Sequence, residues 1–175
     1  MLVPLSWLKK YVKIDLSVEE FVRRMIMSGT AVEGYEDCGA EISNVVVGKL
    51  VEIVKHPNSD HLNICQVDVG REEPVQIVTG AQNVHEGDLV PAALHNSWLP
   101  GGVHITKGKL RGEASNGMLC SFQELGLTQH DVPGAYADGI WILNDEDCRV
   151  GQDINEVIGN DDSIVEFEIT NNRPD

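Results

Sequence analysis

The stretch NVVVGKLVEIVKHPNSDHLNICQVDVG, residues 44–70, decides the fold. Two runs rich in β-branched residues flank the sequence His-Pro-Asn-Ser-Asp, which begins at His56. Pro57 fixes φ, and the Asn, Ser and Asp side chains that follow it can bond the backbone two residues further on. The stretch therefore predicts two β-strands joined by a turn.

Residues 39–151 continue this pattern. Short runs with a period of two predict strands within PVQIVTG (74–80), LVPAAL (89–94), GVHITKGKLRG (102–112), NGMLCS (116–121) and GIWIL (139–143). FQELGL (122–127) predicts one or two helical turns that Gly126 ends. Short strands in series with one small helix favour a five-stranded OB-fold β-barrel over residues 39–151.

The segment before residue 39 has a helical pattern. Leu5, Leu8 and Val12 recur at helical spacing, so residues 4–28 are expected to be largely helical. Ser17 opens the capping box Ser-Val-Glu-Glu of a second helix, which Gly29 ends. The sequence TAVEGYED that follows predicts a strand.

The end of the chain supplies a partner for that strand. DINEVIG (153–159) predicts a short helix, and SIVEFEIT (163–170) predicts an alternating strand whose apolar set is Ile164 or Val165, Phe167 and Ile169. Because an isolated strand needs a partner, residues 1–38 and 152–175 are expected to form one split α/β domain. The fold class is then α+β, with the barrel inserted into this domain. TNNRPD (170–175) is a turn that we expect to open into a further segment.

Charge limits the classes of partner. The formal net charge of the 175 residues is −15, which divides into −1 for residues 1–38, −8 for 39–151 and −6 for 152–175. A chain this acidic repels phosphate as a whole, so any contact with RNA must be local. The apolar runs are too short to cross a bilayer, and the first residues do not form a secretory signal. We therefore expect a cytoplasmic protein without a membrane partner.

A local basic row stands out on this acidic chain. Lys107, Lys109 and Arg111 alternate within one predicted strand, and they are the only Lys or Arg residues between positions 72 and 148. Alternate residues of a strand point to the same face, so the three are predicted to contact tRNA phosphates together. The alternative is a set of solvated residues that pair with Glu113 or other nearby acids.

Neutral side chains form a second group of candidates for tRNA binding. His56, Asn58 and His61 lie in the loop between the first two strands, which OB-folds use to hold a ligand. Ser115 and Ser121 offer hydroxyl groups suited to sugars and base edges. For the loop residues the alternative is turn formation, with His56 capping a strand, and both readings stay open. For most of the neutral residues outside this loop a structural role is favoured.

Other residues are interpreted as structural. Trp98, next to LPGG (99–102), could stack on a base, but packing across the mouth of the barrel is favoured. Gly112 and Gly117 predict turns or bulges with positive φ. Cys65 and Cys120 lie in apolar runs and are expected to be buried and reduced. The four cysteines and six histidines show no spacing typical of a metal site or a catalytic group, so neither is predicted.

Together these motifs resemble the N-terminal region of the β subunit of bacterial phenylalanyl-tRNA synthetases. VPLSWLKKYV resembles the opening helix of that subunit, and EITNNRPD resembles the junction to its later domains. HPNSDHLNICQVDVG, QIVTGAQNV, VPAAL, LPGG and KLRGEASNGMLCS resemble its EMAP-like tRNA-binding domain, which is also appended to methionyl-tRNA synthetases.

The resemblance implies a larger enzyme. Such synthetases are (αβ)₂ heterotetramers that charge tRNA with phenylalanine, and they use ATP and Mg²⁺. Their catalytic site belongs to the α subunit, and the resemblance places the editing, magnesium-ligand and anticodon-binding regions beyond residue 175. It implies no catalytic residue and no cofactor for this chain. Its partners would be tRNA, the α subunit and the remainder of the β subunit.

Two functions compete at this point. The first is an RNA-binding module that touches tRNA on the full synthetase, and the row at Lys107, Lys109 and Arg111 favours it. The second is a structural or assembly module with negligible RNA affinity, which the charge of −8 over residues 39–151 favours. Weak and strongly salt-dependent tRNA binding is therefore expected of the chain by itself.

Overall fold

A computed structural model describes residues 1–136, 138–144 and 146–169. The chain divides into two compact units. The terminal unit comprises Met1–Ala40 and Gly159–Asp175, and the central unit comprises Glu41–Ile158. The predicted junction at 170–175 lies outside the described residues.

The terminal unit is a three-stranded antiparallel sheet with two helices. Its strand order is β1-β11-β2. The elements are β1 (Leu2–Pro4), α1 (Leu5–Leu8), α2 (Val18–Met27), β2 (Ala31–Asp37) and β11 (Ser163–Glu168). Because β11 is the central strand, it carries two of the buried residues of this unit, Val165 and Phe167. Phe21 of α2 packs edge-on against Phe167, with ring centroids 6.4 Å apart.

The helical prediction for residues 4–28 is only partly correct. The first helix is a single turn, and Val12 is exposed rather than part of a helical stripe. The second helix begins as predicted, since the Ser17 hydroxyl accepts a hydrogen bond from the Glu20 N–H at 3.3 Å. It ends before Gly29, which has φ 90°.

The central unit is mostly β-sheet. Its strands are β3 (Ser43–Lys55), β4 (Asn63–Asp68), β5 (Val75–Thr79), β6 (Leu89–Leu99), β7 (Val103–Ile105), β8 (Gly108–Leu110), β9 (Glu113–Ser115) and β10 (Gly117–Leu119). Five of them form the path β10-β6-β3-β4-β5, in which every pairing is antiparallel. In addition β7 pairs with β6, and β8 pairs with β9.

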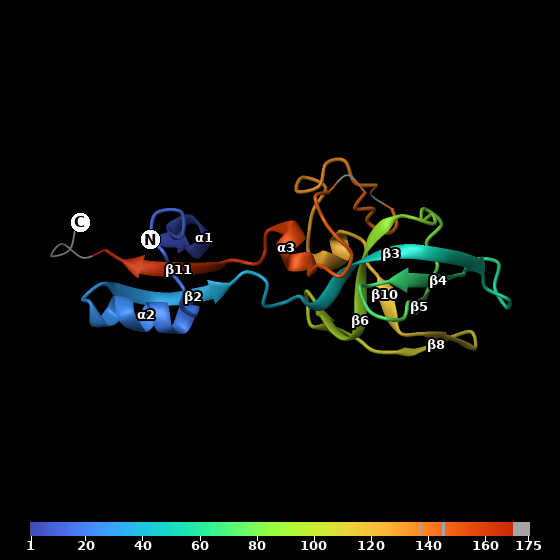
Figure 1. Cartoon of the computed structure of the whole chain (residues 1–175), viewed down its shortest axis with the longest axis horizontal. Helices are drawn as coiled ribbons and strands as arrows, with labels where there is room; N and C mark the ends of the chain where they lie inside the picture. The colour runs from blue at the N-terminus through green and yellow to red at the C-terminus, as the bar shows by residue number, and fades with distance from the viewer. Residues whose placement is uncertain (137, 145, 170–175) are drawn as a thin grey trace. The chain divides into compact units, whose positions relative to one another are not determined.

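The central sheet curls on itself (Figure 1). The long strand β3 pairs with β6 along its first half and with β4 along its second half, and each pairing contains a register shift. Such irregularities bend a strand and increase its twist. At the two ends of the path, the Asn116 N–H donates to the Gln76 carbonyl oxygen at 2.9 Å. The Val78 N–H donates to the Ser115 hydroxyl at 3.0 Å.

The interior of the central unit is apolar. Fully buried residues include Val45, Leu50, Ile77 and Leu143, and Cys65 and Cys120 are buried as predicted. The 3₁₀ turn η1 (Gln123–Leu125) is closed by Gly126 with φ 77°, as the sequence predicts.

Residues 139–143 do not form the predicted strand. They run between two partners instead, because the Trp141 N–H donates to Cys120 O at 3.1 Å and the Leu143 N–H donates to Leu89 O at 2.8 Å. An alternating apolar pattern cannot distinguish this path from a regular strand, although Trp141 is buried.

Helix α3 (Ile154–Ile158) packs within the central unit. Its residue Ile154 is fully buried in the same apolar cluster as Val45 and Leu143. The boundary between the two compact units therefore falls after Ile158, whereas the sequence predicts a domain boundary at residue 152. The helix itself is predicted correctly.

Candidate nucleic-acid interface

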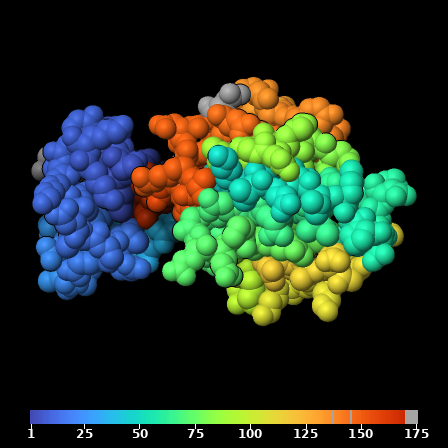
Figure 2. Space-filling view, turned by 45° about the vertical axis from the view of Figure 1, so that its right-hand side comes forward, coloured from blue at the N-terminus to red at the C-terminus, as the bar shows by residue number. Residues whose placement is uncertain are grey.

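The three cations lie on and beside the hairpin of β8 and β9 (Figure 1). Figure 2 shows this yellow segment at the surface of the central unit. Lys109 is in β8, Lys107 directly precedes the strand, and Arg111 is in the turn. All three residues are exposed, which leaves their charged groups accessible.

The prediction that the three cations alternate along one extended strand is wrong. Leu110 pairs with Glu113, so Arg111 and Gly112 form a two-residue turn. Both residues have positive φ, 48° and 98°, as the tightest hairpin turns require. Gly112 was predicted to have this conformation, but Arg111 was not. Arg111 therefore lies at the tip of a hairpin rather than on the face of Lys109.

No carboxylate among the described residues forms an ion pair with Lys107, Lys109 or Arg111. The ion pairs present join other groups, such as Arg23 to Glu20 and Lys13 to Asp15. Glu113, which the sequence offered as a partner, is half-buried and pairs with Leu110 only through the backbone. The hairpin thus presents three exposed positive charges that can bind an anion such as a phosphate.

His56 holds this hairpin in place. Its side chain is buried, and its Nε2 lies 3.0 Å from the carbonyl oxygen of Leu110. The Asn58 N–H donates to its Nδ1 at 3.0 Å. Because Nδ1 accepts a hydrogen bond, Nε2 carries the proton and donates to Leu110. His56 is therefore a positioning residue that joins the turn to the hairpin, and its buried ring is not open to tRNA.

The other two candidates of the turn are accessible. Asn58 and His61 are both exposed, and the hydrogen bond from His56 to Leu110 brings their turn beside the hairpin. Figure 1 shows the β3–β4 turn and the end of the β8–β9 hairpin side by side. The structure therefore places the turn that carries Asn58 and His61 beside the tip of the β8–β9 hairpin.

The two serine candidates have structural roles. Ser115 is 5% exposed, and its hydroxyl accepts from the Val78 N–H and donates to Gly117 O at 2.9 Å. Ser121 is half-buried, and its hydroxyl donates to the Glu124 carboxylate at 3.0 Å at the start of η1. Because these hydroxyls are already used within the fold, they are not retained as tRNA contacts.

An aromatic pair near the hairpin was only half predicted. Trp98 is 47% exposed, so about half of its surface is not covered by packing. Its ring stacks on His104, with centroids 4.4 Å apart and an interplanar angle of 12°. The LPGG turn could have revealed this pair, because it sets the register in which Trp98 lies opposite His104.

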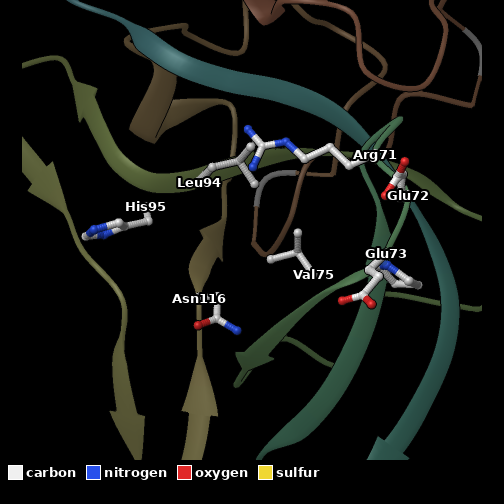
Figure 3. Close-up of a pocket in the computed structure, with 8 residues that line it drawn as sticks. Arg71, Glu72, Glu73, Val75, Leu94, His95 and Asn116 are labelled. Carbon is white, nitrogen blue, oxygen red and sulfur yellow. The ribbon is translucent and has the colours of Figure 1, made fainter.

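A groove of about 660 Å³ in the central unit is lined by residues 71–75, Leu94, His95 and Asn116 (Figure 3). Val75 and Leu94 form its apolar part, and Arg71 extends across it in the view of Figure 3. The carboxylates of Glu72 and Glu73 offset the charge of this arginine. The groove is therefore a poor site for a phosphate, in contrast to the hairpin.

Among the residues described, no three His, Cys, Asp or Glu side chains gather as a set that could hold a metal ion. No helix within the described part of the chain is both long enough and apolar enough to span a membrane.

Comparisons with known proteins place the chain in a family. A family model described as a putative tRNA binding domain matches residues 45–139, which is more than half of the chain. The phenylalanine–tRNA ligase β subunit of Clostridium acetobutylicum is 52% identical over all 175 residues, which cover 22% of that protein. The corresponding subunits of Clostridium tetani and Staphylococcus epidermidis are 50% and 46% identical over the whole chain, which covers 21% and 22% of them.

The chain thus spans about a fifth of the length of the curated relatives it matches. The resemblance predicted from its motifs is confirmed. The chain belongs to the family of putative tRNA-binding domains, and over its whole length it is similar to phenylalanine–tRNA ligase β subunits.

Proposed function

We propose that this chain is the tRNA-binding module of a phenylalanine–tRNA ligase β subunit, and that the β8–β9 hairpin contacts tRNA phosphates. The observation that carries the proposal is the set of three exposed cations without carboxylate partners among the described residues. The family match over residues 45–139 supports the choice of tRNA as the anion.

The finer fold that we propose is a closed five-stranded OB-fold barrel. The path β10-β6-β3-β4-β5 supports it, because the hydrogen bonds between β5 and the segment at Ser115 and Asn116 link the two ends of the path. In such a barrel the β3–β4 turn and the β7–β9 segment are loops at the binding face. We further propose that the terminal unit is a split domain into which this barrel is inserted.

Binding at the hairpin would be electrostatic and weak. With three phosphate contacts, the logarithm of the binding constant should fall by about 2 to 3 for each unit increase in the logarithm of the salt concentration. The net charge of −15 opposes association, so other parts of the enzyme would supply most of the affinity for tRNA. Asn58 and His61 would add neutral hydrogen bonds beside the phosphate contacts.

Chemistry is assigned to the remainder of the synthetase. We propose that the ATP- and Mg²⁺-dependent steps of the full enzyme take place outside this chain. We propose the α subunit and the remainder of the β subunit, in an (αβ)₂ heterotetramer, as its protein partners. A cytoplasmic location follows from this role.

The test is aminoacylation by the full heterotetramer. Replacing Lys107, Lys109 and Arg111 by Ala is expected to raise the KM for tRNA. Activation of phenylalanine, measured by pyrophosphate exchange, should be unchanged because it does not require tRNA. Unaltered tRNA kinetics in the triple variant would contradict the proposal.

An assembly role is the second candidate. The terminal unit exposes large apolar side chains, including Leu2 (67%), Trp7 (50%) and Tyr11 (72%). Such side chains are typical of surfaces that bind another protein. If substitution of the hairpin cations leaves tRNA kinetics unaltered, while Trp7→Ala prevents assembly of the heterotetramer, this role is the one that remains.

A further inference from the structure

We infer that Trp98 and His104 form a stacking platform for an unpaired base of the bound RNA. This inference rests on the proposed function, since the hairpin cations would hold the phosphates of the same RNA segment. It adds a binding mode, recognition of single-stranded RNA by ring stacking, which phosphate contacts alone cannot provide.

The geometry of the pair suits a nucleobase. The two rings are nearly parallel, at 12° and 4.4 Å, and they come from opposite positions of the β6–β7 hairpin. Trp98 is 47% exposed and His104 is exposed as well, so ring surface remains open to solvent. A base that stacks on this surface would extend the existing stack by one member.

His95 connects the platform to the β8–β9 hairpin. The backbone N–H of Lys107 donates to the His95 Nδ1 at 3.1 Å, and His95 lies in β6 three residues before Trp98. Lys107 in turn follows His104 by three residues. A cationic strip that tracks the backbone, next to rings on which bases stack, is the combination that binds single strands.

A second exposed aromatic pair provides the contrast. Trp7 and Tyr11 of the terminal unit are also exposed, but their rings meet edge to face at 67°. This arrangement does not extend a parallel stack. Trp7 therefore serves as a matched control for Trp98, because the two tryptophans have similar exposure in different units.

The platform predicts a preference for unpaired RNA. Bases within a duplex are stacked on one another and cannot lie against a protein ring, whereas bases of loops and ends can. Phosphate contacts occur with both forms. Loss of the platform should therefore weaken binding to single strands selectively, while loss of the cations should weaken binding to both forms.

The experiment measures binding of a labelled single-stranded RNA and of the same sequence as a duplex, by fluorescence anisotropy at low salt. Trp98→Ala is expected to weaken single-strand binding by about five-fold or more and to change duplex binding by less than about two-fold. Trp98→Phe retains a ring and should retain most of the affinity. Trp7→Ala should affect neither RNA.

A second readout uses the emission of Trp98 itself. In a Trp7→Phe background the remaining tryptophans are Trp98 and the buried Trp141, so quenching by single-stranded RNA reports on Trp98. Equal losses for both RNA forms in Trp98→Ala, or binding without quenching, overturn this inference but leave the proposed function intact. If neither RNA binds the unaltered chain at low salt, the platform is overturned, and the proposed function is decided separately by the tRNA kinetics of the triple variant in the heterotetramer.

Discussion

The Nε2 of His56 lies 3.0 Å from the carbonyl oxygen of Leu110, the residue directly before Arg111 at the tip of the basic hairpin. This hydrogen bond joins two segments that are 54 residues apart in the sequence. It holds the residue that precedes the two-residue turn of Arg111 and Gly112. The position of Arg111 thus depends on a buried histidine that does not itself contact solvent.

Replacing His56 by Ala should therefore release the hairpin. The Leu110 carbonyl oxygen and the Asn58 N–H lose their partners, so we expect the free energy of unfolding to fall by about 1 to 3 kcal/mol. Hydrogen–deuterium exchange over residues 108–115 should accelerate. His61→Ala is the control, because His61 is exposed in the same turn and its ring makes no such contact. The account of His56 is wrong if the two variants have equal stability and equal exchange.

Gly117 is required by a close approach of two strands. A Cβ at this position would lie 2.3 Å from the backbone oxygen of Ala93 on β6. Gly117→Ala should therefore separate β10 from β6 and lower the free energy of unfolding by about 2 kcal/mol or more. A Cβ at Gly108 meets no atom within 4 Å. Gly108→Ala should leave stability unchanged or raise it by up to about 1 kcal/mol, and urea unfolding of both variants tests this contrast.

The cysteines should react in an order set by burial. Burial raises the pKa of Cys65 to about 11 and that of Cys120 to about 12, while Cys38 and Cys148 are half-buried. Because the thiolate is the reactive species, alkylation at pH 8 should modify Cys38 and Cys148 first. Mass spectrometry of the native chain checks the order, and the urea-unfolded chain, in which all four should react, is the control. Early modification of Cys120 would show that its segment opens readily.

Much of the fold could be predicted because several of its elements are determined by residues close together in the sequence. The Ser17 capping box, the strand alternation on either side of His56 and the closing Gly126 each depend on neighbours in the sequence. The predicted first helix is longer than the observed one, because apolar spacing alone does not show where the tertiary contacts of a helix end. The packing of helix α3 within the central unit was not predicted, because burial of Ile154 is a long-range contact that no local pattern encodes.

The candidate site was predicted less well for the same reason. The three cations are accessible as expected, but the turn at Arg111 replaces the predicted alternation. Arg-Gly carries a weaker turn signal than the Asn-Gly or Asp-Gly pairs that dominate such hairpins. The side chains of His56 and Ser115 were chosen for their chemistry, yet both are buried by contacts with distant segments.

The salt dependence of tRNA binding tests the central claim most directly. Two variants are compared by anisotropy: Lys107, Lys109 and Arg111 to Ala, and the exposed Lys9, Lys10 and Lys13 of the terminal unit to Ala. Both change the formal net charge by the same amount, from −15 to −18 (−15 − 3). In the hairpin variant the slope of log K against log salt should be shallower by about 2 to 3 than in the unaltered chain. The control variant should have the slope of the unaltered chain. Equal slopes in the two variants would contradict phosphate binding by the hairpin.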